Sequence, residues 1–255
     1  HLTFELFEDH SLVHAQLVMR RNPERGAGLP PLVLDGQQLE LLSVNLADQP
    51  LTDADYQLTD SHLTVQPKSE TFTLDTTVKI HPETNTALEG LYKSSGMFCT
   101  QCEAEGFRKI TYYLDRPDVM SVFTTTVIAE QHSYPVLLSN GNPIASGPGE
   151  DGRHWATWED PFKKPAYLFA LVAGDLWCVE DSFTTMTNRE VALRIYVEPE
   201  NIDKCQHAMT SLKKSMRWDE ETYGREYDLD IFMIVAVNDF NMGAMENKGL
   251  NIFNS

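Results

Sequence analysis

The sequence predicts a mainly β protein, in which a β-sandwich or saddle domain precedes a smaller part with a sheet and one long helix. Over the first two-thirds of the chain, short segments alternate apolar with polar residues, as strands with one buried face do. Pro, Gly, Asp and Asn separate these segments and supply the turns between strands. Residues 203–224 instead repeat their apolar side chains at a period close to 3.6, which is typical of a helix.

The strands expected in the first part follow one another at short, regular intervals, which favours a sandwich or saddle over βαβ units. In order they are LTFELF, SLVHAQLVM, ELLSVNL, HLTVQP, FTLDTTVKI, TTTVIAE, YPVLLSNGNPIASG, RHWATWED and YLFALVAGD. In the seventh, SNGN at 139–142 predicts a hairpin turn, because Asn-Gly accepts positive φ at low cost.

The pattern changes near Asp175, so we divide the chain into an N-terminal β domain, 1–175, and the incomplete start of a second domain, 176–255. No flexible linker is visible, and the two are expected to be tightly joined. Two strands, DSFTTMT and EVALRIYVEP, precede the helix, for which Asp203 is the expected N-cap and Gly224 the residue after the C-terminus. LDIFMIVAV at 229–237 then predicts a strand that is buried on both faces.

Charge and length limit the partners of this chain. Its 255 residues include 38 acidic and 20 basic side chains, for a net charge of −18. Such a balance repels nucleic acid and anionic membranes and favours cationic or amine ligands, although solubility alone also explains it. No apolar run approaches the roughly 20 residues of a membrane span. A first residue other than Met and a last residue within a strand-like run are expected of a piece of a longer protein.

The four cysteines, at positions 99, 102, 178 and 205, are too few for a disulfide-stapled secreted domain of this size. We therefore expect a cytoplasmic location, with a periplasmic or membrane-associated one as the alternative. Cys99 and Cys102 form CTQC, which invites a redox or zinc interpretation. A zinc site needs a second pair at similar spacing, and a redox motif should open a helix, so buried structural thiols are the preferred interpretation.

Near the end of the chain, Gly243 and Ala244 leave the backbone bare beside a carboxylate, Glu246. An extended peptide can approach such a strand closely and hydrogen-bond along its edge. A peptide α-amine has a pKa near 8 and is mostly cationic at neutral pH, so a fixed carboxylate can anchor it. An anchor of this kind selects the first residue of a peptide. The alternative is that Glu246 is an ordinary solvated glutamate.

The string GAMEN resembles the exopeptidase motif of the aminopeptidase N family of zinc metalloaminopeptidases, which also carry an HExxH motif. The chain is similar to bacterial members of that family between residues 85 and 255, in NTALEGLY, CTQCEAEGFRKITYYLDRPDV, YPVLLSNGN, KPAYLFALVAGD and MGAMENKGLNIFNS. Roughly the first 80 residues fit the opening β domain of the family in pattern only. The resemblance implies that 176–255 are the sheet and first helix of an incomplete thermolysin-like α/β catalytic domain.

The resemblance also implies roles for the acidic residues. Glu246 would bind the free α-amine of the substrate, and Glu103, from the β domain, would be the second amine-binding carboxylate. Gln101 would contact the pocket for the first side chain and help to orient the amine. Glu105 is the alternative to Glu103 as the second carboxylate.

The rest of the implied site surrounds Glu246 in the sequence. Met242 would line the first side-chain pocket, and Gly243 and Ala244 would offer backbone groups to the substrate. Met245 and Asn247 complete the motif and are counted among the substrate-binding residues.

Metal ligands are the part of the family pattern that this chain does not match. In the family, HExxH and a further glutamate, after GAMEN, hold zinc and supply the general base. His10 and His14 in HSLVH lie four apart, but in a strand they would be about 13 Å apart, too far to share a metal. We expect Zn²⁺ in the full-length parent but no metal and no catalytic residue in this chain.

The predicted function is the substrate-anchoring part of a zinc aminopeptidase that releases the N-terminal residue of peptides. Its partners would be a peptide with a free N-terminal amine and the remainder of its own catalytic domain. A relative that hydrolyses epoxides on the same fold is one alternative. A non-catalytic module that binds peptide amines is the other.

Overall fold

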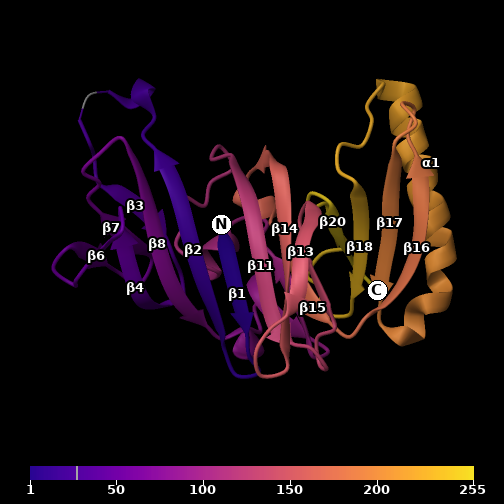
Figure 1. Cartoon of the computed structure of the whole chain (residues 1–255), viewed down its shortest axis with the longest axis horizontal. Helices are drawn as coiled ribbons and strands as arrows, with labels where there is room; N and C mark the ends of the chain where they lie inside the picture. Colours follow the sequence, from indigo (N-terminus) through magenta and orange to yellow (C-terminus); the bar gives the residue numbers. More distant parts are fainter. Residues whose placement is uncertain (27) are drawn as a thin grey trace.

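The computed structural model describes residues 1–26 and 28–255. Within them the strands form sheets of eight, four, five and three strands, accompanied by one long α-helix (Figure 1). The predicted fold class, mainly β with a helix near the C-terminus, is confirmed. None of the helices in the described part of the chain is long and apolar enough to cross a membrane.

The largest sheet forms the centre of the N-terminal part, and most of its strands bury alternate side chains, as their sequences predict. Its order is β13-β14-β11-β1-β2-β8-β4-β5, with β1 parallel to β11. The strands are β1 (Leu2–Leu6), β2 (Ser11–Arg20), β4 (Glu40–Leu46), β5 (Gln49–Pro50), β8 (Thr71–Ile80), β11 (Ser121–Glu130), β13 (Asn142–Pro148) and β14 (Arg153–Lys164).

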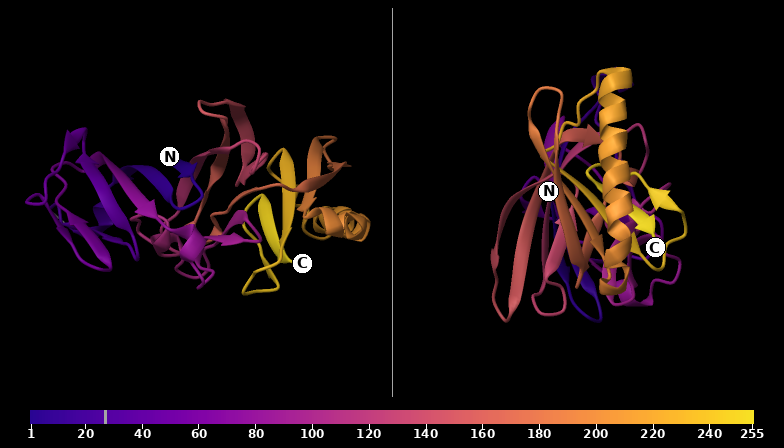
Figure 2. Two further views of the ribbon diagram at one scale, coloured as in Figure 1. Left: turned by 90° about the horizontal axis from the view of Figure 1, so that it is seen from below. Right: turned by 90° about the vertical axis from the view of Figure 1, so that its right-hand side faces the viewer.

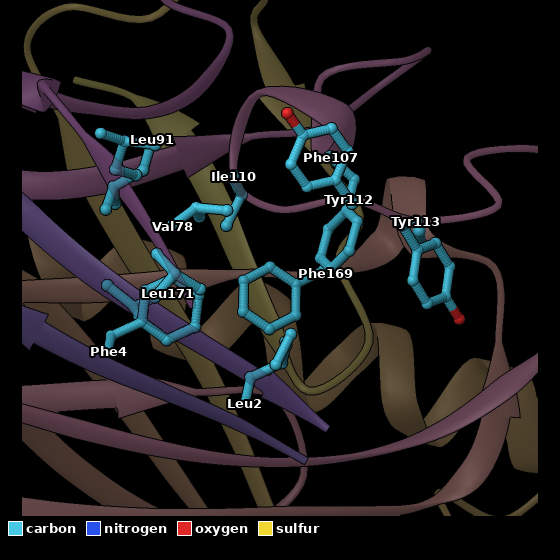
Figure 3. Packing of buried hydrophobic residues seen from close by; sticks show 14 of the residues in the cluster. Leu2, Phe4, Val78, Leu91, Phe107, Ile110, Tyr112, Tyr113, Phe169 and Leu171 are labelled. Carbon is cyan, nitrogen blue, oxygen red and sulfur yellow. The ribbon is translucent and has the colours of Figure 1, made fainter. Parts of the chain in front are cut away.

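A three-stranded sheet lies at one end of the molecule and shares the core of the large sheet (Figure 1). It consists of β3 (Leu32–Asp35), β6 (Tyr56–Leu58) and β7 (His62–Val65). The shared core is rich in aromatic rings (Figure 3). Phe169 stacks on Phe4 at 5.8 Å between ring centroids and meets the edge of Phe107 at 5.3 Å. Such geometries add to the stabilisation from area burial.

The four-stranded sheet carries the first half of the candidate site. Its order is β12-β15-β10-β9, and nearly every residue in it is buried. The strands are β9 (Gly90–Ser94), β10 (Met97–Gln101), β12 (Val136–Ser139) and β15 (Leu171–Gly174).

The predicted SNGN hairpin is wrong. β12 pairs with β15 in the four-stranded sheet, whereas β13 pairs with β14 in the large sheet, so Asn140 and Gly141 carry the chain from one sheet to the other. Gly141 has φ +94°, and a Cβ there would lie 2.1 Å from the backbone oxygen of Glu159. Glycine is therefore required by a close backbone crossing, and not by a two-residue turn.

The C-terminal part contains the five-stranded sheet, in the order β16-β17-β18-β20-β19, with α1 (Cys205–Tyr223) against one face (Figure 2). Its strands are β16 (Trp177–Thr184), β17 (Glu190–Val197), β18 (Ile231–Val237), β19 (Ala244–Met245) and β20 (Leu250–Asn254). The sheet starts at Trp177; the division into 1–175 and 176–255 itself stays a prediction.

The helix agrees with the sequence except at its start. Gly224 follows α1 in the left-handed region, φ +59°, as predicted. Asp203 is not the N-cap: Pro199–Lys204 already form a 3-10 helix, so the cap position falls on Lys204, without a side-chain cap. The prediction for β18 holds on one face only, since Phe232, Ile234 and Ala236 are partly buried. Other 3-10 helices are Pro23–Arg25, Pro82–Thr84, Phe107–Lys109 and Ala166–Leu168.

Candidate peptide-amine binding site

The Gly-Ala-Met-Glu-Asn motif lies on an outer edge of the five-stranded sheet. β19 pairs antiparallel with β20, through Ala244 with Phe253 and Met245 with Ile252, and with no other strand in the described part of the chain. One edge of β19 therefore keeps unpaired backbone N–H and C=O groups. This is the geometry that adds an extended peptide as a further strand.

Exposure divides the side chains of this motif into two groups. Gly243, Ala244 and Glu246 are exposed, and a Cβ on Gly243 would meet no atom within 4 Å. Met245 is fully buried in the core, and Asn247 is only 1% exposed. Met245 and Asn247 were both predicted to bind substrate, but their side chains lie inside the protein. They can act on a ligand only through the backbone or through the position of their neighbours.

The two predicted amine-binding carboxylates are alike in exposure and in pairing. Glu103 and Glu246 are both exposed, and within residues 1–26 and 28–255 neither makes an ion pair. Glu105, the alternative to Glu103, is 3.3 Å from the guanidinium of Arg108. An acid that is already paired is less available to a ligand amine, so the geometry favours Glu103 over Glu105. The peptide bond between Glu103 and Ala104 is cis.

Gln101 joins the two halves of the site. It ends β10, is 2% exposed, and its Nε2 donates to the backbone oxygen of Glu103 at 3.4 Å. The same Nε2 lies 3.4 Å from the sulfur of Met242, which is 38% exposed. The structure thus brings Gln101, Glu103 and Met242 together from segments 141 residues apart. The other oxygen of the amide, Oε1, is buried without a partner among the described residues.

The loop between β18 and β19 is held by residues that the sequence did not single out. The hydroxyl of Ser94 donates to Asp239 Oδ2 at 2.8 Å and accepts from the Asp239 backbone N–H at 3.0 Å. Tyr92 donates to the backbone oxygen of Asp239 at 2.9 Å, and Asn241 donates to that of Ala87 at 3.0 Å. All of these bonds connect β9 or its approach to the segment just before the motif.

Asn140 holds the other side of the motif. Its Nδ2 donates to the backbone oxygens of Lys248 at 2.8 Å and Leu168 at 3.0 Å, and its Oδ1 accepts from Ala170 N–H at 2.7 Å. The sequence feature at this position, Asn140-Gly141, predicted a hairpin turn and not the contacts that Asn140 makes. The partners lie 28 to 108 residues away, so local sequence could not identify them.

The cysteines of CTQC are free thiols in the interior. Burial raises the pKa of Cys99 to about 12 and that of Cys102 well above the ordinary value. Neutral, buried thiols are poor nucleophiles, which supports the structural interpretation over a redox motif. Cys99 lies within strand β10 and Cys102 follows it directly, whereas a redox motif should open a helix.

The two histidines of HSLVH, His10 and His14, have separate partners. His10 lies 2.8 Å from Asp9, and His14 lies 3.0 Å from Glu5, so each imidazole has a separate carboxylate partner. Within the described ranges, no three His, Cys, Asp or Glu side chains converge as metal ligands would. The residues that the structure describes therefore do not fit a zinc site.

Two family models match most of the chain. Residues 2–168 match the peptidase M1 N-terminal domain, and residues 207–255 match the peptidase family M1 domain. The chain is 56% identical to aminopeptidase N of Escherichia coli (strain K12) and 54% identical to that of Caulobacter vibrioides, over 254 residues and 100% of this chain. It spans 29% of the length of each of these relatives.

A solved structure is similar throughout. The crystal structure of Legionella pneumophila aminopeptidase A in complex with aspartic acid superimposes with a TM-score of 0.92 at 37% identity. The similarity covers 99% of this chain and 30% of that one.

Proposed function

The chain belongs to peptidase family M1, and we propose that it is the substrate-anchoring portion of a zinc-dependent aminopeptidase that removes the N-terminal residue of peptides. The observation that carries this proposal is the contact between Gln101 and Met242. It joins the β domain, which bears Glu103, to the loop that leads into β19, which Glu246 follows. Within the described residues neither carboxylate makes an ion pair.

In this proposal the two carboxylates accept hydrogen bonds from the ammonium group of the peptide. An α-amine is mostly protonated at neutral pH, and bonds between ionised partners are about twice as strong as neutral ones. Because Glu103 and Glu246 come from different parts of the chain, only a ligand that reaches both is fully bound. An acylated N-terminus carries no positive charge and keeps only one N–H donor, so it cannot satisfy both acids, which makes the site selective for free amines.

The edge of β19 and the Met242 side chain would place the rest of the peptide. Unpaired backbone groups along Ala244 can hydrogen-bond an extended chain, and the partly exposed thioether can line an apolar pocket for the first side chain. Gln101, whose Nε2 contacts both Met242 and the Glu103 backbone, would hold the pocket residue and the second acid in place. Together these contacts fix the position of the first peptide bond, which is where orientation contributes to rate.

Zinc belongs to the proposal for the full-length parent. Because the residues described in this chain do not form a ligand set, its metal ligands and its catalytic base would come from elsewhere in the protein. What this chain would contribute is binding and orientation of the substrate. The buried, free thiols fit a reducing compartment, and a cytoplasmic location is part of the proposal.

The test is a kinetic comparison of Glu246→Ala with Glu221→Ala in the full-length enzyme. Glu221 is an exposed glutamate on α1, remote in sequence from the motif, and is the matched control. Loss of a charge-assisted contact predicts a fall in kcat/KM on an alanyl tripeptide of about tenfold to hundredfold for Glu246→Ala. Glu221→Ala should stay close to wild type. Equal losses in the two variants would remove Glu246 from the amine site.

A further inference from the structure

The six-residue loop between β18 and β19, residues 238–243, places Met242 and sets where the motif strand begins. It contains no regular structure, so its shape depends on side-chain contacts. Within its own sheet it is held by Asn254 N–H, which donates to the Gly243 backbone oxygen at 3.0 Å, and by Phe240, which is buried in the core. These contacts fix the loop at its last residue, Gly243, and at its third residue, Phe240, whereas Asp239 and Asn241 have partners outside this sheet.

The β domain holds the loop at its second residue, Asp239. Ser94 is 1% exposed and exchanges two hydrogen bonds with Asp239, one to the carboxylate at 2.8 Å and one from the backbone N–H at 3.0 Å. Tyr92, fully buried two residues earlier on β9, donates to the Asp239 backbone oxygen at 2.9 Å. Three bonds from one strand thus converge on one residue, across 145 to 147 positions of sequence.

This arrangement is a clamp, which we define as Tyr92, Ser94 and Asp239. Tyr92 and Ser94 of the clamp lie on the same sheet as Gln101, because β9 is the antiparallel partner of β10 and Gly90 pairs with Gln101. The clamp, the Asn241–Ala87 bond and the Gln101–Met242 contact therefore hold the loop against the β9–β10 hairpin and the segment that precedes it. Fixed points on so short a loop determine the direction in which the chain enters β19.

We infer that Asp239 is a positioning residue for the amine site, holding the Glu246 segment in register with Gln101 and Glu103 through its bonds to Ser94. Asp239 does not itself touch the peptide. This inference rests on the proposed function. Its physical basis is that a misplacement of about 1 Å far from the reacting atoms can cost on the order of a hundredfold in rate.

Among the described residues, the Ser94 hydroxyl donates to the Asp239 carboxylate. Removal of the carboxylate takes this acceptor away from the buried Ser94 hydroxyl and weakens the attachment of the loop to β9. Asp239→Asn keeps an acceptor oxygen for Ser94 and should preserve the loop. Ser94→Ala removes the same bond from the other side.

The experiment measures KM and kcat on an alanyl tripeptide for full-length Asp239→Ala, Asp239→Asn, Ser94→Ala and the double variant Ser94→Ala/Asp239→Ala. Asp55→Ala is the matched control, because Asp55 also accepts from a neighbouring hydroxyl, Thr52 Oγ1 at 2.7 Å, but lies elsewhere in the β domain. Glu246→Ala is measured beside them. Melting temperatures of all variants show whether each still folds.

A positioning role predicts that Asp239→Ala and Ser94→Ala each raise KM at least about tenfold. The double variant should be no worse than either single variant, because both substitutions remove the same hydrogen bond. Asp239→Asn and Asp55→Ala should stay within twofold of wild type. Wild-type KM in both Asp239→Ala and Ser94→Ala, or additive losses in the double variant, would overturn the inference. If Glu246→Ala also keeps wild-type KM, the proposed function fails; if only Glu246→Ala loses affinity, the positioning role alone fails.

Discussion

The side-chain amide of Gln101 lies 3.4 Å from the sulfur of Met242, although 141 residues separate them in the chain. This contact spans the two parts of the molecule, because Gln101 ends a strand of the β domain and Met242 precedes the motif strand. With the Ser94–Asp239 bonds and Asn140 on Lys248, it makes the β domain a structural support of the candidate site. An amine site assembled this way needs both parts to be folded.

The choice between Glu103 and Glu105 can be decided by substitution in the full-length enzyme. Glu103→Gln should raise KM for an alanyl tripeptide about tenfold, because one charge-assisted bond to the ammonium group is lost. Glu105→Gln should leave KM close to wild type, since Glu105 is paired with Arg108 at 3.3 Å. The reverse order of effects would make Glu105 the second amine-binding acid.

Gly141→Ala should lower the free energy of unfolding by about 2–4 kcal/mol, from overpacking together with a strained positive φ. A Cβ at this position would lie 2.1 Å from the Glu159 backbone oxygen, and φ is +94°. Gly152→Ala is the matched control, because Gly152 also has positive φ, +72°, but no atom lies within 4 Å of its added Cβ. Urea unfolding measures both; an equal cost would show that φ alone matters and that the sheet crossing is loose.

The thiols of CTQC should resist alkylation while the protein is folded. Cys99 and Cys102 are buried, and their raised pKa values keep them neutral at pH 8. Because the thiolate is the reactive form, iodoacetamide should label neither residue until the chain is unfolded. Peptide mapping by mass spectrometry gives the result. Rapid labelling of either cysteine in the native protein would favour a redox role after all.

The buried pair of Lys164 and Asp160 gives a pH-dependent prediction. Lys164 Nζ lies 3.1 Å from Asp160 Oδ2, and burial lowers the pKa of Lys164 to about 8 from 10.5. Between these values the unfolded chain binds more protons than the folded one, so stability rises with pH. The gain from Lys164 is on the order of 3 kcal/mol across this window.

Lys164→Met removes this pH dependence, and the exposed neighbour Lys163→Met serves as its control. The difference in unfolding free energy between wild type and Lys164→Met should therefore grow from pH 8 to pH 10. The difference between wild type and Lys163→Met should stay constant. A constant difference for both variants would mean that Lys164 keeps an ordinary pKa in the folded protein.

Alternating patterns predicted the strands of the large sheet because these strands bury one face and expose the other. The same rule missed β9 and β10, whose residues are almost all buried and so show no alternation. The long helix was located by its period, but its N-cap was misplaced because a 3-10 helix at Pro199–Lys204 precedes it. Local signals identify an element more easily than the exact residue at which it starts.

The site was predictable from sequence only as far as its motif. The string GAMEN identifies Glu246, but the sequence does not show that Met245 and Asn247 face inward, because burial depends on the pairing of β19 with β20. Ser94 and Asp239 have no local signature at all. Their bonds join segments 145 residues apart, and only the packed fold brings them together.

The central claim, that Glu103 and Glu246 grip one ammonium group, is tested most directly by a double-mutant cycle. Affinities of the full-length enzyme for an alanyl tripeptide are measured by calorimetry in wild type, Glu103→Gln, Glu246→Gln and the double variant. If both acids bind one amine, the double loss should differ from the sum of the single losses by at least about 0.5 kcal/mol, the coupling expected of groups that share a partner. Additive losses, or an unchanged affinity in either single variant, would contradict the account.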